Sequence, residues 1–156
     1  MIIHYQPEGG DLQRLDAGRM RASEIQIIER TADDHWASLK GAMRQGDINA
    51  LRTVAWAILK RSNPALRYSE FDPWEGELRV RLDNTEVHAY AAAFLEKYHG
   101  APDDLAQAFD ELREAADNPE VAEAAIADVT APKGQAAPEL EPVPAEPETA
   151  ASPSAA

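Results

Sequence analysis

The side chains of this sequence that ordinarily titrate near neutral pH are four histidines: His4, His35, His88 and His99. They could act as acid–base groups or as metal ligands. Metal sites on helices need ligands at close, regular spacings, and no two of these histidines have such a spacing. We therefore interpret all four as exposed or helix-end residues and expect no metal site.

Paired carboxylates are the second arrangement that could do acid–base chemistry. Glu75 and Glu77 flank Gly76, but a solvated connecting loop explains this pair better. The sequence has no cysteine, no glycine-rich phosphate loop and no Gly-x-Ser-x-Gly nucleophile turn. We predict no catalytic residues, no cofactor and no enzymatic activity.

Large aromatic side chains form a more informative set: Trp36, Trp56, Tyr68, Phe71 and Trp74. Aromatic residues at helical spacing usually belong to a core, but tryptophan is also a frequent anchor of protein interfaces. Trp56 is the strongest candidate for exposure, because its helix already has a full apolar face without it. We predict that partner binding involves Trp56, Tyr68, Phe71 and Trp74.

The elements that must position these residues are mostly helical. Hydrophobic periodicity and capping residues predict helices over 22–30, 33–44, 48–61, 85–99 and 103–116, and a short helix to 128. The N-terminal sequence predicts a short β-hairpin formed by residues 2–6 and 12–15. Residues 78–82 alternate between aliphatic and basic side chains, as in a short strand. The predicted fold class is mainly α, a small helical domain with an N-terminal hairpin.

Charge divides the chain unevenly. Residues 1–100 hold 13 basic and 15 acidic residues, whereas residues 101–156 hold 2 basic and 13 acidic residues. From residue 129 onward, six prolines and eight alanines accompany only three large aliphatic residues, a composition typical of disorder. We expect a helical body over 1–100, an acidic helical extension over 101–128 and a disordered acidic Ala/Pro-rich tail over 129–156.

Composition also excludes two kinds of partner. Phosphate contacts need lysine and arginine, so a chain with a net charge of −13 is a poor general nucleic-acid binder. The sequence lacks a run of about 18 apolar residues, which a membrane-spanning helix requires. We expect no nucleic-acid partner and no membrane partner.

Residues 22–72 carry an ordered series of features: Glu24 and Glu29 before Thr31, then Trp36, Gly46-Asp47, Trp56, Lys60-Arg61, Asn63-Pro64 and the segment Tyr68–Asp72. In order and spacing this stretch resembles the tail assembly chaperones of long-tailed, non-contractile (siphovirus-type) bacteriophages, especially those that infect actinobacteria. The hairpin before Asp16 also fits the family layout. Family members often have glycine after Thr31, where this chain has Ala32.

The resemblance implies a non-enzymatic role in tail assembly. Such chaperones bind the long, largely helical tape measure protein and keep it soluble until tail tube subunits polymerise around it. They act in the host cytoplasm and are absent from the mature virion. The aromatic residues could receive amphipathic helices, and the charged tail would keep a complex dispersed.

Chaperones of this family are commonly made in two lengths by a −1 ribosomal frameshift, and the longer form is linked to recruitment of the tail tube protein. Ala131-Pro132-Lys133 can be encoded as GCC CCA AAG, which contains a slippery heptamer. Our hypothesis is that the frame changes near Lys133; the alternative is that Pro132-Lys133 is an ordinary linker dipeptide.

A second class of function shares the acidity, the helices and the tail. An acidic regulatory binding protein, such as an antitoxin or an inhibitor, neutralises a single folded partner. It usually pairs one-to-one through a disordered segment that folds on its target. The chaperone is expected to bind in many copies through its folded body, so stoichiometry discriminates between the two.

Overall fold

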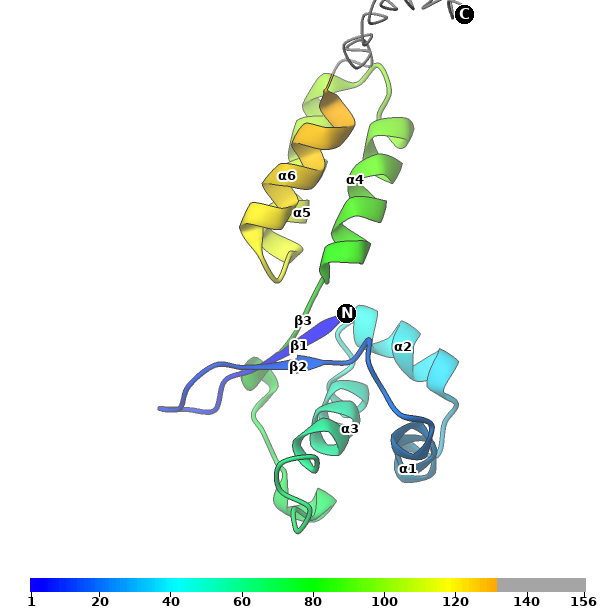
Figure 1. Ribbon diagram of the computed structural model, residues 1–156, viewed down its shortest axis with the longest axis vertical. Coiled ribbons are helices and arrows are strands. Elements are labelled where there is room, and N and C mark those ends of the chain that lie inside the picture. Colours follow the sequence, from blue (N-terminus) through cyan, green and yellow to red (C-terminus); the bar gives the residue numbers. More distant parts are fainter. Residues whose placement is uncertain (132–156) are drawn as a thin grey trace, which may run out of the picture.

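The computed structural model describes residues 1–131 (Figure 1). Their elements in chain order are β1 (Ile2–Tyr5), β2 (Gln13–Asp16), α1 (Ala22–Ala32), α2 (Trp36–Arg44), α3 (Ile48–Leu59), two short 3₁₀ turns (Tyr68–Glu70 and Glu75–Glu77), β3 (Leu78–Arg81), α4 (Asn84–Lys97), α5 (Pro102–Ala115) and α6 (Pro119–Thr130). The predicted fold class, mainly helical with a small N-terminal hairpin, is confirmed. The predicted disorder of 132–156 lies outside the described residues, and α6 continues two residues into the predicted tail.

The predicted hairpin is part of a larger sheet. β1 pairs antiparallel with β2 on one side and with β3 on the other, so the strand order is β2-β1-β3. Ile3 lies opposite Leu15 and Val80 in this register. Ile3 is fully buried in the same cluster as α3, so this face of the sheet closes the core.

The third helix, α3, is the centre of this core. Asp47 caps it, because its carboxylate accepts a hydrogen bond from the backbone N–H of Ala50 at 2.8 Å. Leu51, Val54 and Ala55 are buried, and α3 packs against α1, α2 and all three strands. A helix that is apolar around most of its circumference belongs inside a domain, as the sequence predicted.

The turn between α1 and α2 differs from the prediction of a helix over 33–44. Asp33 adopts a left-handed conformation with φ 53° and ends α1, and its backbone N–H bonds to the carbonyl of Glu29. Asp34 accepts hydrogen bonds from the backbone of His35 and the hydroxyl of Ser38, each at 2.7 Å. The two aspartates therefore form the turn rather than the first helical turn of α2, which begins at Trp36.

Two separate hydrophobic clusters divide the described chain. One belongs to the body, residues 1–81, and the other to the helical unit, α4 to α6. Figure 1 shows the sheet with α1–α3 on one side and α4–α6 on the other. Val87 and Ala91 of α4 are buried with Phe109 of α5 and Ala122 of α6. The expected boundary at residue 100 therefore does not coincide with the boundary between the clusters, which lies just before α4.

Candidate partner-binding site

Two of the residues considered for acid–base chemistry, His4 and Glu77, have structural roles. The other four are exposed: His35, His88, His99 and Glu75. His4 is half-buried on β1, and its Nε2 lies 2.6 Å from Oδ1 of Asp117, so its interpretation as an exposed or helix-end residue is wrong. Glu77 accepts hydrogen bonds from the backbone N–H groups of Trp74 at 2.9 Å and Glu8 at 2.6 Å. Its carboxylate thereby fixes two loops. Within residues 1–131, no group of three or more histidine or acidic side chains could hold a metal ion.

Trp56, expected to be exposed, is buried. Its side chain is 7% exposed, and Nε1 donates a hydrogen bond to the carbonyl of Leu66 at 3.1 Å. Its ring meets that of Tyr68 edge-to-face at 5.3 Å. The chain after Pro64 folds back over the face of α3 that the sequence left uncovered. The expectation of exposure was wrong because this cover comes from outside the helix.

Tyr68 and Phe71 attach the segment that follows Pro64 to the rest of the body. The hydroxyl of Tyr68 lies 3.0 Å from that of Thr53, and the guanidinium of Arg52 lies 4.4 Å from the Tyr68 ring centroid. Arg52 also donates hydrogen bonds to the carbonyls of Tyr68 at 3.1 Å and Phe71 at 2.7 Å. Phe71 is buried and meets Tyr5 edge-to-face. Tyr68 is half-buried, so only part of its ring is open to a partner.

Trp74 differs from the other predicted binding residues. Its side chain is 74% exposed, the highest fraction among the exposed large hydrophobic residues of the described chain. Its backbone is held by Glu77, so the ring projects from an ordered turn. A fixed, exposed tryptophan is an unusual surface feature and a frequent interface anchor. Trp74 is therefore the candidate site residue that the structure leaves available.

Two hollows adjoin the turn that follows Trp74, and Gly76 and Arg79 line both of them. One hollow, of about 470 Å³, has apolar walls from α3 and β3: Ile48, Leu51, Leu78 and Val80. The other, of about 430 Å³, lies over the outer face of the sheet and includes His4, Arg81 and Leu12 as well as Glu8 and Glu77. Among residues 1–131, Arg79 forms no ion pair. The surface around Trp74 thus offers apolar walls and a free positive charge.

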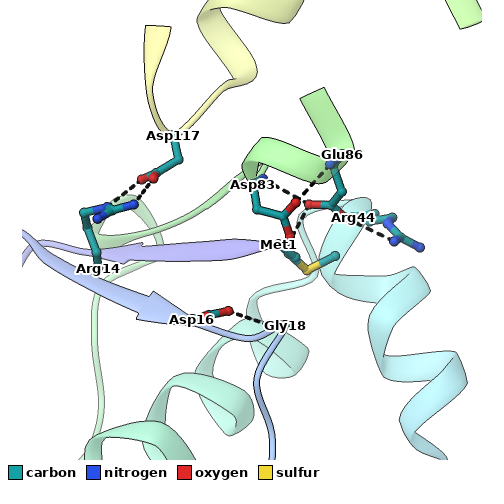
Figure 2. A network of polar contacts seen from close by, with 8 residues as sticks. All are labelled: Met1, Arg14, Asp16, Gly18, Arg44, Asp83, Glu86 and Asp117. Carbon is teal, nitrogen blue, oxygen red and sulfur yellow. Dashed lines mark hydrogen bonds and ion pairs between the residues drawn. The ribbon is translucent and has the colours of Figure 1, made fainter. Parts of the chain in front are cut away.

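A polar network joins the body to the helical unit (Figure 2). The ammonium group of Met1 contacts the carboxylates of Asp83 and of Glu86, the latter at 2.7 Å, and Glu86 also pairs with Arg44 at 3.2 Å. Burial alone would lower the pKa of the Met1 ammonium, but its hydrogen bonds to the two carboxylates raise it above the ordinary value. Burial would raise the pKa of Asp83, but the bond from Met1 lowers it.

A second contact of the same kind involves the loop between α5 and α6, and its residues Arg14 and Asp117 line one hollow together with Asp83. Asp117, between α5 and α6, pairs with Arg14 of β2 (Figure 2). Its carboxylate also contacts His4. The hydrogen bond from Arg14 is the main reason that the pKa of Asp117 lies below its ordinary value. Backbone bonds from Leu82 N–H to the Ala115 carbonyl, and from Asp117 N–H to the Leu82 carbonyl, lie beside it. No local sequence pattern could have revealed these pairs, because their partners lie far apart in the chain.

Comparison with known proteins identifies no relative. No protein-family model, no characterised protein and no solved structure matches this chain. Within residues 1–131, none of the helices is both long enough and apolar enough to cross a membrane.

Proposed function

We propose that this protein is a tail assembly chaperone, which binds the tape measure protein and keeps it soluble until tail tube subunits polymerise around it. The resemblance of residues 22–72 to such chaperones supports the proposal. The observation that carries it is the exposure of Trp74, at 74%, on a body whose other predicted binding aromatics are buried or half-buried. Such a residue is suited to anchor a partner rather than to stabilise the fold.

The distribution of charge supports a solubilising role. Residues 1–81 contain twelve acidic and twelve basic residues, whereas residues 82–131 contain twelve acidic and only two basic residues. The body can therefore contact a partner without strong repulsion, while the helical unit gives the complex a large net charge. Net charge of one sign keeps proteins dispersed.

The same proposal includes a long form that recruits the tail tube protein. α6 ends at Thr130, and Lys133 follows three positions later. A frame change at Lys133 would therefore leave both hydrophobic clusters intact. On this proposal the chaperone acts in the host cytoplasm and is absent from the mature virion.

Co-expression with the tape measure protein of the same genome tests the function. We expect the full chain to keep the tape measure protein in the supernatant and to co-purify with it. Trp74→Ala should weaken both effects. Tyr90→Ala is a matched control, because Tyr90 is an exposed aromatic residue of α4 in the helical unit. If the full chain neither binds nor solubilises the tape measure protein, the proposed function is wrong.

The mass of the complex separates the chaperone from the alternative, an acidic antitoxin-like or inhibitor-like binder. We expect many copies of the chain on each tape measure protein, measured by light scattering coupled to size exclusion. A complex with one copy of each protein would favour the regulatory binder instead.

A further inference from the structure

All three methionines of the chain line a single hollow of about 330 Å³. We call it the methionine hollow. Its apolar lining comes from the N-terminus, the turn before α1, and helices α1 and α2: Met1, Ala17, Met20, Ile25, Trp36 and Met43. This surface is distinct from the surface around Trp74, with which it shares no lining residue.

The lining of the hollow combines buried residues with half-buried residues that can change conformation. Met1 and Met43 are buried in the core of the body, whereas Met20, Ile25 and Trp36 are half-buried. Methionine is unbranched and polarisable, so it can repack around incoming side chains of different shapes. Surfaces rich in methionine bind the apolar faces of amphipathic helices in this way.

Charges at the rim indicate which helix fits best. The two carboxylates of Asp83 and Glu86 are together balanced by the Met1 ammonium and the Arg44 guanidinium. Lys40 is exposed with its Nζ 5.9 Å from the Trp36 ring centroid, and it forms no ion pair within residues 1–131. An incoming group therefore meets an unneutralised ammonium beside an apolar surface, which favours a carboxylate.

We propose that the methionine hollow binds the apolar face of an amphipathic helix that carries a carboxylate beside its apolar side chains. The tape measure protein is the source of this helix, so in that respect the inference rests on the proposed function. The hollow receives the apolar side chains, and Lys40 pairs with the carboxylate at its rim.

The three methionines provide the measurement. The full chain is labelled at its methionine methyl groups with ¹³C and titrated with a synthetic helical peptide of about five turns. The peptide has leucines at positions i, i+3, i+4 and i+7 and glutamates beside them. We expect all three methyl signals to shift together and to saturate. A peptide of the same composition with leucines distributed around the helix should not shift them, and equal shifts from both peptides would overturn the proposal.

Charge reversal tests the role of Lys40. Lys40→Glu should weaken binding of the glutamate peptide by about threefold or more, and a peptide with lysines in place of glutamates should lose this dependence. Lys97→Glu is the matched control, because Lys97 is exposed on α4 and does not line the hollow. Equal weakening by both substitutions would contradict a specific contact at Lys40.

The tape measure protein distinguishes this inference from the proposed function. If it co-purifies with the labelled chain while the methionine signals stay unchanged, the hollow is not the helix site, although the function stands. If the peptide shifts the three signals but the tape measure protein does not bind, the hollow binds helices and the proposed function fails.

Discussion

Arg14 and Asp117, which are 103 positions apart in the sequence, form a two-bond ion pair across the junction between the body and the helical unit. Nε of Arg14 donates to Oδ1 of Asp117 at 2.9 Å, and Nη2 donates to Oδ2. The Asp117 side chain is only 2% exposed. Nε2 of His4 approaches the same carboxylate, so one aspartate contacts two side chains that lie opposite each other on β1 and β2.

Replacing this carboxylate should weaken the fold. In Asp117→Asn, Arg14 loses its counter-charge and His4 loses a carboxylate hydrogen-bond partner. We expect the free energy of unfolding to fall by about 1–3 kcal/mol, measured by urea denaturation. Asp128→Asn removes an exposed carboxylate that forms no ion pair within residues 1–131 and should change it by less than about 0.5 kcal/mol. Equal losses in both variants would contradict a specific role for Asp117.

Stability should fall at both ends of the pH scale. Asp83 and Asp117 have pKa values below their ordinary 3.8, so their contribution is present above that value and is lost as pH falls through the folded-state pKa. The Met1 ammonium has a pKa above its ordinary 8.0, so its contribution is present below 8.0 and is lost as pH rises through the folded-state pKa. The midpoint of urea denaturation, measured from acidic to alkaline pH, tests both the acidic and the alkaline loss of stability.

Acetylation of the Met1 amine is the control for the loss of stability at alkaline pH. It removes the charge at every pH, so the acetylated chain should be less stable near neutral pH and should lose less stability on alkalinisation. If the acetylated chain loses as much stability at alkaline pH as the unmodified chain, the loss comes from other groups.

Two tryptophans should respond differently to truncation. Trp56→Ala removes a buried ring and its bond to Leu66, so we expect a loss of about 3–5 kcal/mol in the free energy of unfolding. Trp74→Ala removes an exposed ring, and the change should stay within about 0.5 kcal/mol. Thermal and urea unfolding of both variants test this contrast. A large loss of stability in Trp74→Ala would show that this ring supports the fold.

The turn between α1 and α2 offers a stabilising substitution. Asp33 has φ 53°, a left-handed conformation that is strained for residues with a Cβ atom. Asp33→Gly should raise the free energy of unfolding by about 0.5–1 kcal/mol. Asp34→Gly should instead lower the free energy of unfolding, because it loses the hydrogen bonds to His35 and Ser38. A denaturant midpoint that falls for Asp33→Gly would contradict the assigned strain.

The sequence predicted those features that depend on neighbouring residues. The hairpin and α3 follow from short-range alternation, from the cap at Asp47 and from the long apolar face. Capping and periodicity also place α4 correctly. They do not determine which cluster α4 joins, because α4 packs against residues distant in the sequence, such as Ala122 of α6. The register of β3 against β1 is similarly non-local.

The candidate site was predictable to a smaller extent. The composition of 65–82 indicated a connecting segment with large aromatic residues, but not which of these rings would be buried. Trp56 and Phe71 are covered by contacts across the fold, and Trp74 stays outside because it lies in a turn held by Glu77. The methionine hollow was missed, because its three methionines are spread over more than forty positions and share no pattern.

The uneven division of charge between the two clusters makes the molecule an electric dipole, with a neutral body at one end and a strongly negative helical unit at the other. Copies attached side by side along one extended partner would orient these negative ends outward, away from one another. Repulsion between neighbouring helical units would then extend about one Debye length beyond their surfaces, about 8 Å at physiological ionic strength and about 3 Å in 1 M salt. The number of copies that coat a partner of given length should therefore increase with salt.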